Sequence, residues 1–275
     1  MLASIMANLD RKMGVSFEQY RKTFQNILGT NPAVVLLHED PKGRPLFHEA
    51  CIYHPGSQSL FVSSNQLPTR EVPRDGTRPE KRVVISRVWD RDDAAASALT
   101  EITPPTLIMA NGGANYGSGL LFCAQGDKMD DSTSGIVCVP DPEQPQRSHF
   151  LISSFRGRPF NSVNDVVVNP SDRSIWFTDP CYGFHQGFRR APELPSQVYR
   201  FDPLEEDIRA MADDLTRPNG LCFSPDLQTL YVTDTGAIHG APDVVYDKVG
   251  KATIYAFDVR IFENGMFRRT GSLLR

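Results

Sequence analysis

Three oxygen-bearing side chains stand at matching places in this sequence, each beside the start of an apolar run: Glu49, Asn164 and Asn219. One carboxylate and two amide carbonyls are the donors that a hard cation prefers. Ca²⁺ suits them best, because it accepts roughly 6 to 8 oxygens in loose geometry. Zinc would instead favour nitrogen or sulfur ligands. These residues therefore predict a calcium site, if the fold brings them together.

Each of these positions also has an ordinary explanation. Asn-Asp and Asn-Gly pairs are common turn residues ahead of strands, and for any single asparagine that interpretation is the better one. The recurrence of the set at matched positions favours the site. Asp165, directly after Asn164, adds a second carboxylate to this stretch.

Two histidines lie in segments that are expected to cover the site, His185 within 179–195 and His239 within 234–247. Either could donate a hydrogen bond to a substrate or move a proton, and a surface or packing role is the alternative for each. The other histidines show no metal-ligand spacing. The candidate catalytic residues are Asn164, Asp165, His185 and His239.

The elements that must position these residues are β-strands. Residues 166–168 form a continuous valine run typical of a strand buried on both faces, residues 169–172 have turn composition, and residues 175–178 form a second strand. A hairpin brings strand ends together. Asn164 and Asp179 are therefore expected at one rim.

The same pattern of polar residues, strand, turn and aromatic strand begins near Glu49, Asn111, Asn164 and Asn219, at intervals of 62, 53 and 55 residues. Third strands are predicted at residues 82–89, 135–139, 197–202 and 253–259. A regular repeat of this kind indicates the blades of an all-β β-propeller. Because the innermost strands of successive blades begin on one face, Glu49, Asn164 and Asn219 are expected to point into the central channel.

One helix is predicted ahead of the propeller. Residues 16–19 form a capping-box pattern, and an apolar face that includes Phe24 and Ile27 follows until Gly29. We expect this helix to dock by its aromatic face. The predicted domains are an N-terminal segment at residues 1–32 and a propeller at residues 33–275.

Composition excludes several classes of protein. The 275 residues carry a net charge of −4 and a pI near 5.9, which argues against nucleic acid and anionic membrane surfaces as partners. No apolar run approaches the roughly 20 residues of a membrane span. Residues 1–15 lack a secretory apolar region, so a cytoplasmic location is expected.

The five cysteines include no Cys-x-x-Cys pair and are predicted to be buried free thiols. The oligomeric state is not indicated.

Several motifs together resemble the gluconolactonase family, also called the senescence-marker or regucalcin-like group, and within it the fungal lactonohydrolase branch. They are residues 110–116 (ANGGANY), 161–168 (NSVNDVVV), 176–183 (WFTDPCYG), 217–226 (RPNGLCFSPD) and 231–235 (YVTDT). The resemblance covers roughly residues 45 to 260 and is strong in combination.

The resemblance implies a six-bladed β-propeller with one catalytic divalent ion, usually Ca²⁺, held by a Glu, one or two Asn and an Asp. Glu49, Asn164 and Asn219 take the first three places. The resemblance further implies hydrolysis of a small-molecule lactone, and the residues assigned to substrate binding are Asn111, Asn115, Asn161 and Tyr182.

Two departures from the family pattern refine this expectation. Ser162 stands where the animal enzymes have an Arg, which favours a substrate other than an animal-type aldonolactone. Four repeats are visible, whereas six would need roughly 330 residues, so the propeller is expected to be truncated to about four blades. The family's Asp ligand in the fifth blade would then be absent. The general base would be Glu49, Asp165 or a histidine of the covering segments.

The sequence therefore predicts a metal-dependent lactonohydrolase in which Ca²⁺ polarises the lactone carbonyl and water attacks it. A catalytically degenerate propeller that binds a small molecule or an ion is the alternative. A lyase-type propeller of the strictosidine-synthase kind is a third possibility, but it requires a catalytic Glu that has no clear counterpart here.

Overall fold

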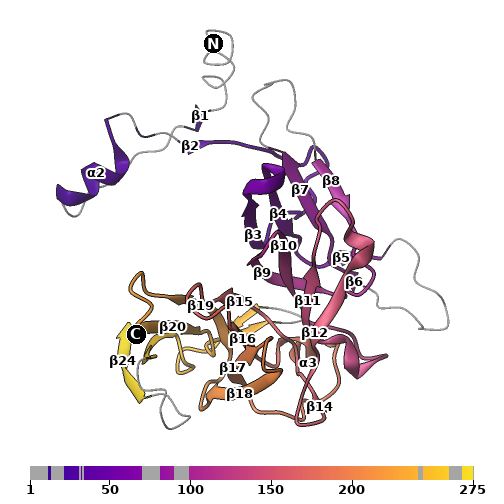
Figure 1. Ribbon diagram of the computed structural model, residues 1–275, viewed down its shortest axis with the longest axis vertical. Helices are drawn as coiled ribbons and strands as arrows, with labels where there is room; N and C mark the ends of the chain where they lie inside the picture. The colour runs from indigo at the N-terminus through magenta and orange to yellow at the C-terminus, as the bar shows by residue number, and fades with distance from the viewer. Residues whose placement is uncertain are drawn as a thin grey trace.

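A computed structural model of the chain describes residues 12–13, 22–30, 32, 34–69, 81–89, 99–240, 244–259 and 268–274. Within these residues, four antiparallel sheets of four strands each follow one another along the chain (Figure 1). We call them blades 1 to 4. The prediction of an all-β propeller with four visible blades is confirmed.

Each blade runs in chain order from its inner to its outer strand. Blade 1 comprises β3 (Glu49–His54), β4 (Ser59–Ser63), β7 (Ile85–Trp89) and β8 (Leu99–Ile102). Blade 2 comprises β9 (Ala110–Tyr116), β10 (Gly119–Ala124), β11 (Gly135–Val139) and β12 (His149–Ile152). Blade 3 comprises β15 (Val166–Val168), β16 (Ile175–Asp179), β17 (Gln197–Asp202) and β18 (Asp207–Ala212). Blade 4 comprises β19 (Pro218–Phe223), β20 (Thr229–Asp234), β23 (Thr253–Asp258) and β24 (Arg268–Leu274).

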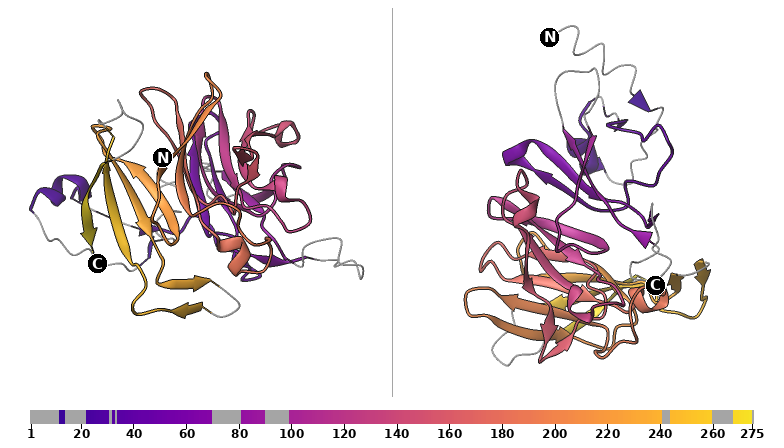
Figure 2. Two further views of the ribbon diagram at one scale, coloured as in Figure 1. Left: turned by 90° about the horizontal axis from the view of Figure 1, so that it is seen from below. Right: turned by 90° about the vertical axis from the view of Figure 1, so that its right-hand side faces the viewer.

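The inner strands lie next to one another, as the propeller prediction requires. β3 contacts β9, β9 contacts β15, and β15 contacts β19. Figure 2 shows the same succession from another side, from the yellow strands of blade 4 to the purple and magenta strands of blades 1 and 2. The starts of four inner strands therefore meet at one face of the molecule.

Short elements connect or flank the blades. The two-stranded pairs are β1 (Lys12–Met13) with β2 (Val34–Val35), β5 (Leu67–Pro68) with β6 (Lys81–Arg82), β13 (Ser154–Phe155) with β14 (Arg158–Pro159), and β21 (Ile238–Gly240) with β22 (Val244–Tyr246). The helical turns are η1 (Lys22–Phe24), α2 (Gln25–Leu28), η2 (Pro55–Ser57), η3 (Asp131–Thr133), η4 (Pro145–Arg147) and α3 (Tyr182–His185). Of the helices in the described residues, none has the length and apolar character needed to cross a bilayer.

The hydrophobic core consists of layers between neighbouring blades. Trp176 packs with residues of blades 3 and 4, and Phe177, its neighbour on β16, packs with residues of blades 2 and 3. Successive side chains of a strand point to opposite faces, so a strand between two blades is apolar on both. This is why all five residues of β16 are buried, and why the sequence of such a strand reads as a continuous apolar run.

At the rim of blade 3, a carboxylate at the end of the second strand binds the backbone of the segment that leads into the first strand. Asp179 accepts hydrogen bonds from the backbone N–H groups of Asn161 at 2.9 Å and Ser162 at 2.7 Å. Asp234 does the same in blade 4 for Thr216 and Arg217. Asn164, predicted to share a rim with Asp179, donates its backbone N–H to Thr178 O at 2.9 Å, directly before Asp179. That prediction is therefore confirmed, and the hairpin geometry explains it.

Asp179 also makes stability depend on pH. Burial raises the pKa of this carboxyl to about 7, against the hydrogen bonds from Ser162 and Asn161 and the nearby Arg189 charge, which lower it. The folded-state pKa lies above the unfolded value of about 3.9. The contribution of Asp179 to stability is therefore complete below a pH of about 3.9 and is lost as the pH rises through the folded-state pKa of about 7. Between pH 5 and pH 8, we expect the unfolding free energy to fall by about 2 kcal/mol more in the parent protein than in Asp179→Asn.

Urea unfolding of both proteins at the two pH values measures this difference. The amide of the Asp179→Asn variant has a single oxygen and can accept from only one of the two N–H groups with its usual geometry, so the variant is expected to be less stable at both values while showing the flatter profile. Equal pH profiles for the two proteins would contradict the prediction.

Two further expectations were wrong, one about the N-terminal helix and one about the burial of the cysteines. The described part of the N-terminal helix is one turn of 3₁₀ helix followed by α2, and its apolar residues are not docked: Phe24 is 38% and Ile27 78% exposed. The capping-box residues 16–19 lie outside the described residues, and the domain boundary at residue 32 stays a prediction. All five cysteines are free, but the prediction that they are buried is wrong for Cys51 of β3 and Cys222 of β19, which are exposed.

Candidate functional site

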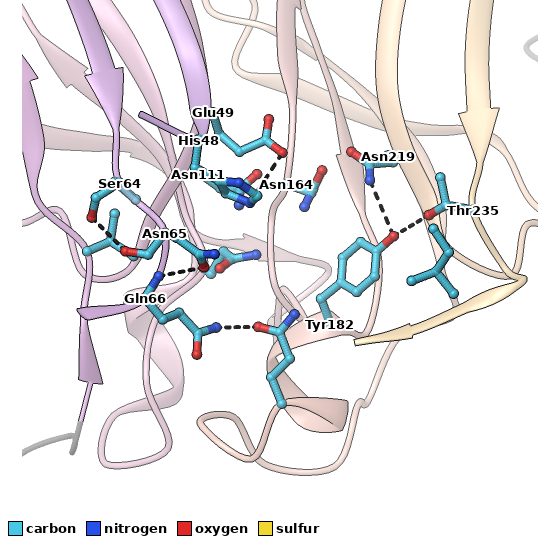
Figure 3. A pocket seen from close by; sticks show the side chains of 15 residues that line it. His48, Glu49, Ser64, Asn65, Gln66, Asn111, Asn164, Tyr182, Asn219 and Thr235 are labelled. Carbon is cyan, nitrogen blue, oxygen red and sulfur yellow. Dashed lines mark hydrogen bonds and ion pairs between the residues drawn. The ribbon is translucent and has the colours of Figure 1, made fainter. Parts of the chain in front are cut away.

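A cavity of about 300 Å³ opens where the inner strands begin (Figure 3). All four blades contribute to its lining, and the segment that contains α3 also contributes. Twelve of the fifteen lining residues have polar or charged side chains. The lining residues are His48, Glu49, Ser64, Asn65, Gln66, Val83, Ala110, Asn111, Gln125, Asn164, Tyr182, Gln186, Asn219, Thr235 and Ile238.

One residue from each blade's inner region brings an oxygen to this cavity: Glu49, Asn111, Asn164 and Asn219. The structure thus brings together the three predicted metal ligands and adds Asn111, predicted as a substrate contact, at the equivalent place in blade 2. Figure 3 shows these four side chains gathered at one end of the cavity.

Irregular strand pairing accompanies three of these four residues, Glu49, Asn111 and Asn219. The register of β3 with β4 shifts between Glu49 and Ile52, and that of β19 with β20 shifts between Pro218 and Leu221. β9 has a similar shift beside Asn111. Such bulges re-aim side chains and are frequent next to functional sites. In blade 1 the bulge residues Ala50 and Cys51 have φ values of 66° and 52°, which are unusual for residues with a side chain.

Two of the amide oxygens lack a partner. Among the described residues, neither Asn111 Oδ1 nor Asn164 Oδ1, both buried, receives a hydrogen bond. A buried carbonyl oxygen without a partner costs free energy and calls for an explanation, such as an ion. With the Glu49 carboxylate beside them, these oxygens fit a hard cation. The described residues contain no group of three His, Cys, Asp or Glu side chains able to hold a metal, so amide oxygens would have to complete the ligand set.

Asp165 lies behind the cavity and does not line it. Its Oδ1 accepts from Val166 N at 2.9 Å and its Oδ2 from Leu221 N at 3.1 Å, which links blade 3 to blade 4. Burial raises the pKa of this carboxyl to about 6, the two N–H donors lower it, and the negative charge of Glu49 adds a smaller increase. Its predicted catalytic role is therefore not kept, because its oxygens are turned to backbone groups.

Tyr182 lies in the cavity wall, as the assignment to substrate binding requires. Its hydroxyl is hydrogen-bonded to Thr235 Oγ1 and accepts from Asn219 Nδ2 at 3.3 Å. Burial raises the pKa of this phenol. The covering segments predicted from the sequence therefore do reach the cavity, through Tyr182, Gln186, Thr235 and Ile238.

Three of the remaining predicted site residues lie elsewhere. Asn115 donates its side-chain amide to Tyr53 O at 2.8 Å in an exposed position, far along β9 from Asn111. The Asn161 side chain is buried and holds the backbone of Leu194. His185 is exposed beside Phe184. None of the three is among the described residues that line the cavity, so we no longer assign Asn115 and Asn161 to substrate binding or His185 to proton transfer.

His239 is described by its backbone alone, which pairs with Val245 between β21 and β22. Its neighbour Ile238 lines the cavity. A role for His239 in proton transfer therefore stays a prediction.

Sequence reasoning missed several lining residues. His48 Nε2 lies 3.7 Å from Glu49 Oε1, and Gln66 Nε2 donates to Gln186 Oε1 across the mouth of the cavity. Comparison of matching positions in the sequence repeats could have identified some of these lining residues. The residue that follows the second strand lines the cavity in blades 1, 2 and 4, where it is Ser64, Gln125 and Thr235.

The chain is similar to known proteins of one family. Residues 82–239 match the family described as SMP-30/Gluconolactonase/LRE-like region. Two relatives from Aspergillus oryzae are lactonohydrolase oryL, 33% identical over 85% of this chain and 52% of its own length, and lactonohydrolase oryH, 39% identical over 85% of this chain and 60% of its own length. A solved gluconolactonase from Xanthomonas campestris superposes with a TM-score of 0.57 at 28% identity, over 82% of this chain and 62% of that one. The chain thus spans between half and two thirds of the length of these relatives.

Proposed function

Because this chain belongs to the SMP-30/gluconolactonase/LRE-like family, we propose that its cavity binds and hydrolyses a small lactone with the help of a divalent cation. The observation that carries this proposal is the convergence of one carboxylate and three amide side chains, from four separate blades, on one cavity. The names of the relatives, lactonohydrolase and gluconolactonase, support lactone hydrolysis as the reaction.

Glu49, Asn164 and Asn219 are the residues that would hold the cation, with the Asn111 oxygen available beside them. When bound, a divalent ion supplies a Lewis acid that polarises the lactone carbonyl. Ca²⁺ is the ion that suits this set, because its donors are all oxygens. The buried and unpartnered oxygens of Asn111 and Asn164 support this proposal.

The residues of the cavity would do the rest of the chemistry. Water adds to the carbonyl carbon, the ring C–O bond breaks, and the released alkoxide takes a proton, which yields a hydroxy acid. A proton acceptor must lie within hydrogen-bond reach of the attacking water. We propose His48 or Glu49 for this role, because these titratable side chains line the cavity while Asp165 does not. The amide groups of Gln66 and Gln125 would orient the substrate.

Chelation tests the metal dependence. We expect the purified protein to hydrolyse one or more of a panel of aldono-, pantoyl- and alkyl-substituted lactones, followed by acid release in a pH-stat. The rate is expected to fall at least about tenfold in EDTA and to return with excess Ca²⁺, because the cation supplies most of the charge stabilisation.

The outcomes separate the two classes of function considered from the sequence. Hydrolysis at an unchanged rate in EDTA would contradict the metal role. Cation binding without hydrolysis of any lactone in the panel would favour a propeller that only binds.

A further inference from the structure

We propose that Tyr182 and Thr235 are positioning residues that fix the orientation of the Asn219 side-chain amide, so that Oδ1 of Asn219 faces the cavity. This inference rests on the proposed function, because it assigns Asn219 as an oxygen donor. It concerns how that donor is held, and neither Tyr182 nor Thr235 is placed among the ligands.

Hydrogen bonds link Asn219, Tyr182 and Thr235 to the backbone carbonyl of Arg217. This carbonyl sets the direction of donation along the series. Arg217 O can only accept, and it receives both the backbone N–H of Thr235 at 3.1 Å and the single hydroxyl hydrogen of Thr235 at 3.4 Å. The Thr235 oxygen then remains as an acceptor for Tyr182.

Tyr182 in turn has one hydroxyl hydrogen, and because the Thr235 hydrogen is directed at Arg217 O, we assign the Tyr182 hydrogen to the contact between the two hydroxyls. The Tyr182 oxygen is then left with acceptor capacity only. Its other partner must therefore be a donor, and it is Asn219 Nδ2, at 3.3 Å. The chain of donation runs from Asn219 through Tyr182 and Thr235 to Arg217.

The orientation of Asn219 is the consequence. An amide can turn over and exchange its oxygen and nitrogen, and only its hydrogen bonds decide between the two arrangements. With Nδ2 committed to Tyr182, Oδ1 points the other way. Figure 3 shows the nitrogen of Asn219 directed at Tyr182 and its oxygen directed toward Asn164. The opposite arrangement would present an NH₂ group to a cation and repel it.

Tyr182 is itself held firmly. It begins α3, and the next backbone N–H, of Gly183, donates to Ser162 Oγ at 2.9 Å. A Cβ atom at Gly183 would lie 2.3 Å from Arg189 Cγ, so α3 packs tightly against the chain that follows it. Thr235 follows β20 of blade 4. The hydrogen-bond chain therefore connects the covering segment of blade 3 to the donor of blade 4.

Two substitutions at Thr235 form a matched pair for the test. Thr235→Val keeps the shape but removes the hydroxyl, whereas Thr235→Ser keeps the hydroxyl. We expect calorimetric titration with CaCl₂ to show affinity about tenfold or more weaker in Thr235→Val and Tyr182→Phe, and within about twofold of the parent in Thr235→Ser, as for groups that orient metal ligands. Equal affinity of Thr235→Val and the parent would overturn the inference.

A second measurement does not depend on any cation. The side-chain amide signals of Asn219 in a ¹H–¹⁵N spectrum are assigned by their loss in Asn219→Asp. We expect these signals to shift in Tyr182→Phe and in Thr235→Val, and to stay in place in Thr235→Ser. Signals that do not move in Thr235→Val would overturn the inference. If the parent binds no Ca²⁺, the metal part of the proposed function fails, and this spectrum still decides the hydrogen-bond order.

Discussion

Glu49→Gln is expected to lower kcat/KM for lactone hydrolysis by at least about a hundredfold. Glu49 is the only carboxylate among the described residues that line the cavity, and the other polar side chains there are amides, hydroxyls and one histidine. Removing its charge takes away the one anionic ligand and one of the two proposed proton acceptors, and loss of a single stabilising group at a reacting centre typically costs about 10² to 10³ in rate. Calorimetric titration with CaCl₂ should show weaker binding in the same variant.

Two controls locate the effect. Glu205→Gln removes a carboxylate from the exposed turn between β17 and β18, and Asn115→Ala removes an amide from the same strand as Asn111 but outside the cavity. Both variants are expected to keep kcat/KM within about twofold of the parent, because surface changes of this kind are usually small. A Glu49→Gln protein as active as these controls would disprove the assignment of this carboxylate.

Gly112→Ala is expected to destabilise the fold by about 3 kcal/mol, the upper part of the range for overpacking a closed interior. The inner strands of blades 2 and 3 meet here, and Gly112 N donates to Asn164 O at 2.8 Å. An added Cβ would lie 2.4 Å from Asp165 Oδ1, 2.8 Å from Asn164 O and 2.9 Å from Asp165 Cα. Backbone atoms cannot turn aside as a side chain can, so the two blades would have to separate.

The equivalent glycine of blade 4 gives a matched control. Gly220 follows Asn219 as Gly112 follows Asn111, but its added Cβ would lie 3.5 Å from Thr233 Oγ1 and 3.7 Å from Asp165 Oδ2, which are ordinary contacts. Gly220→Ala is expected to change stability by less than about 1 kcal/mol. Urea unfolding of both variants measures the contrast, and equal stability of the two would show that the inner strands can move apart freely.

The blades could be predicted from sequence because the repeat is visible in short-range patterns. The valine run at residues 166–168 and the aromatic strand after it alternate with turns at regular intervals, and blade packing imposes that composition on every copy. The same regularity located Glu49, Asn164 and Asn219, since matched positions in a repeat become matched positions in space.

The predictions that the structure does not support concern residues whose position relative to the cavity depends on how the whole chain folds. A local sequence pattern does not contain that information. Asn115 and Asn111 both lie on β9, but only Asn111 is at the end of the strand that reaches the cavity. His185 was judged by its place in a covering segment, while the cavity histidine, His48, has no spacing pattern to mark it. The N-terminal helix was judged by its apolar face alone, and Phe24 and Ile27 on that face are exposed.

The contacts of the Asp165 carboxylate affect how much the oxygen donors would have to move when an ion binds. It accepts from the backbone of blade 4, sits against Gly112 of blade 2, and belongs to blade 3. The spacing between oxygens on these blades is thus held by contacts of the Asp165 carboxylate with the main chain of its neighbours, and it does not rely on an ion to draw them together. Binding would then cost little rearrangement, and discrimination among ions of different radius would follow from how the sheets are packed.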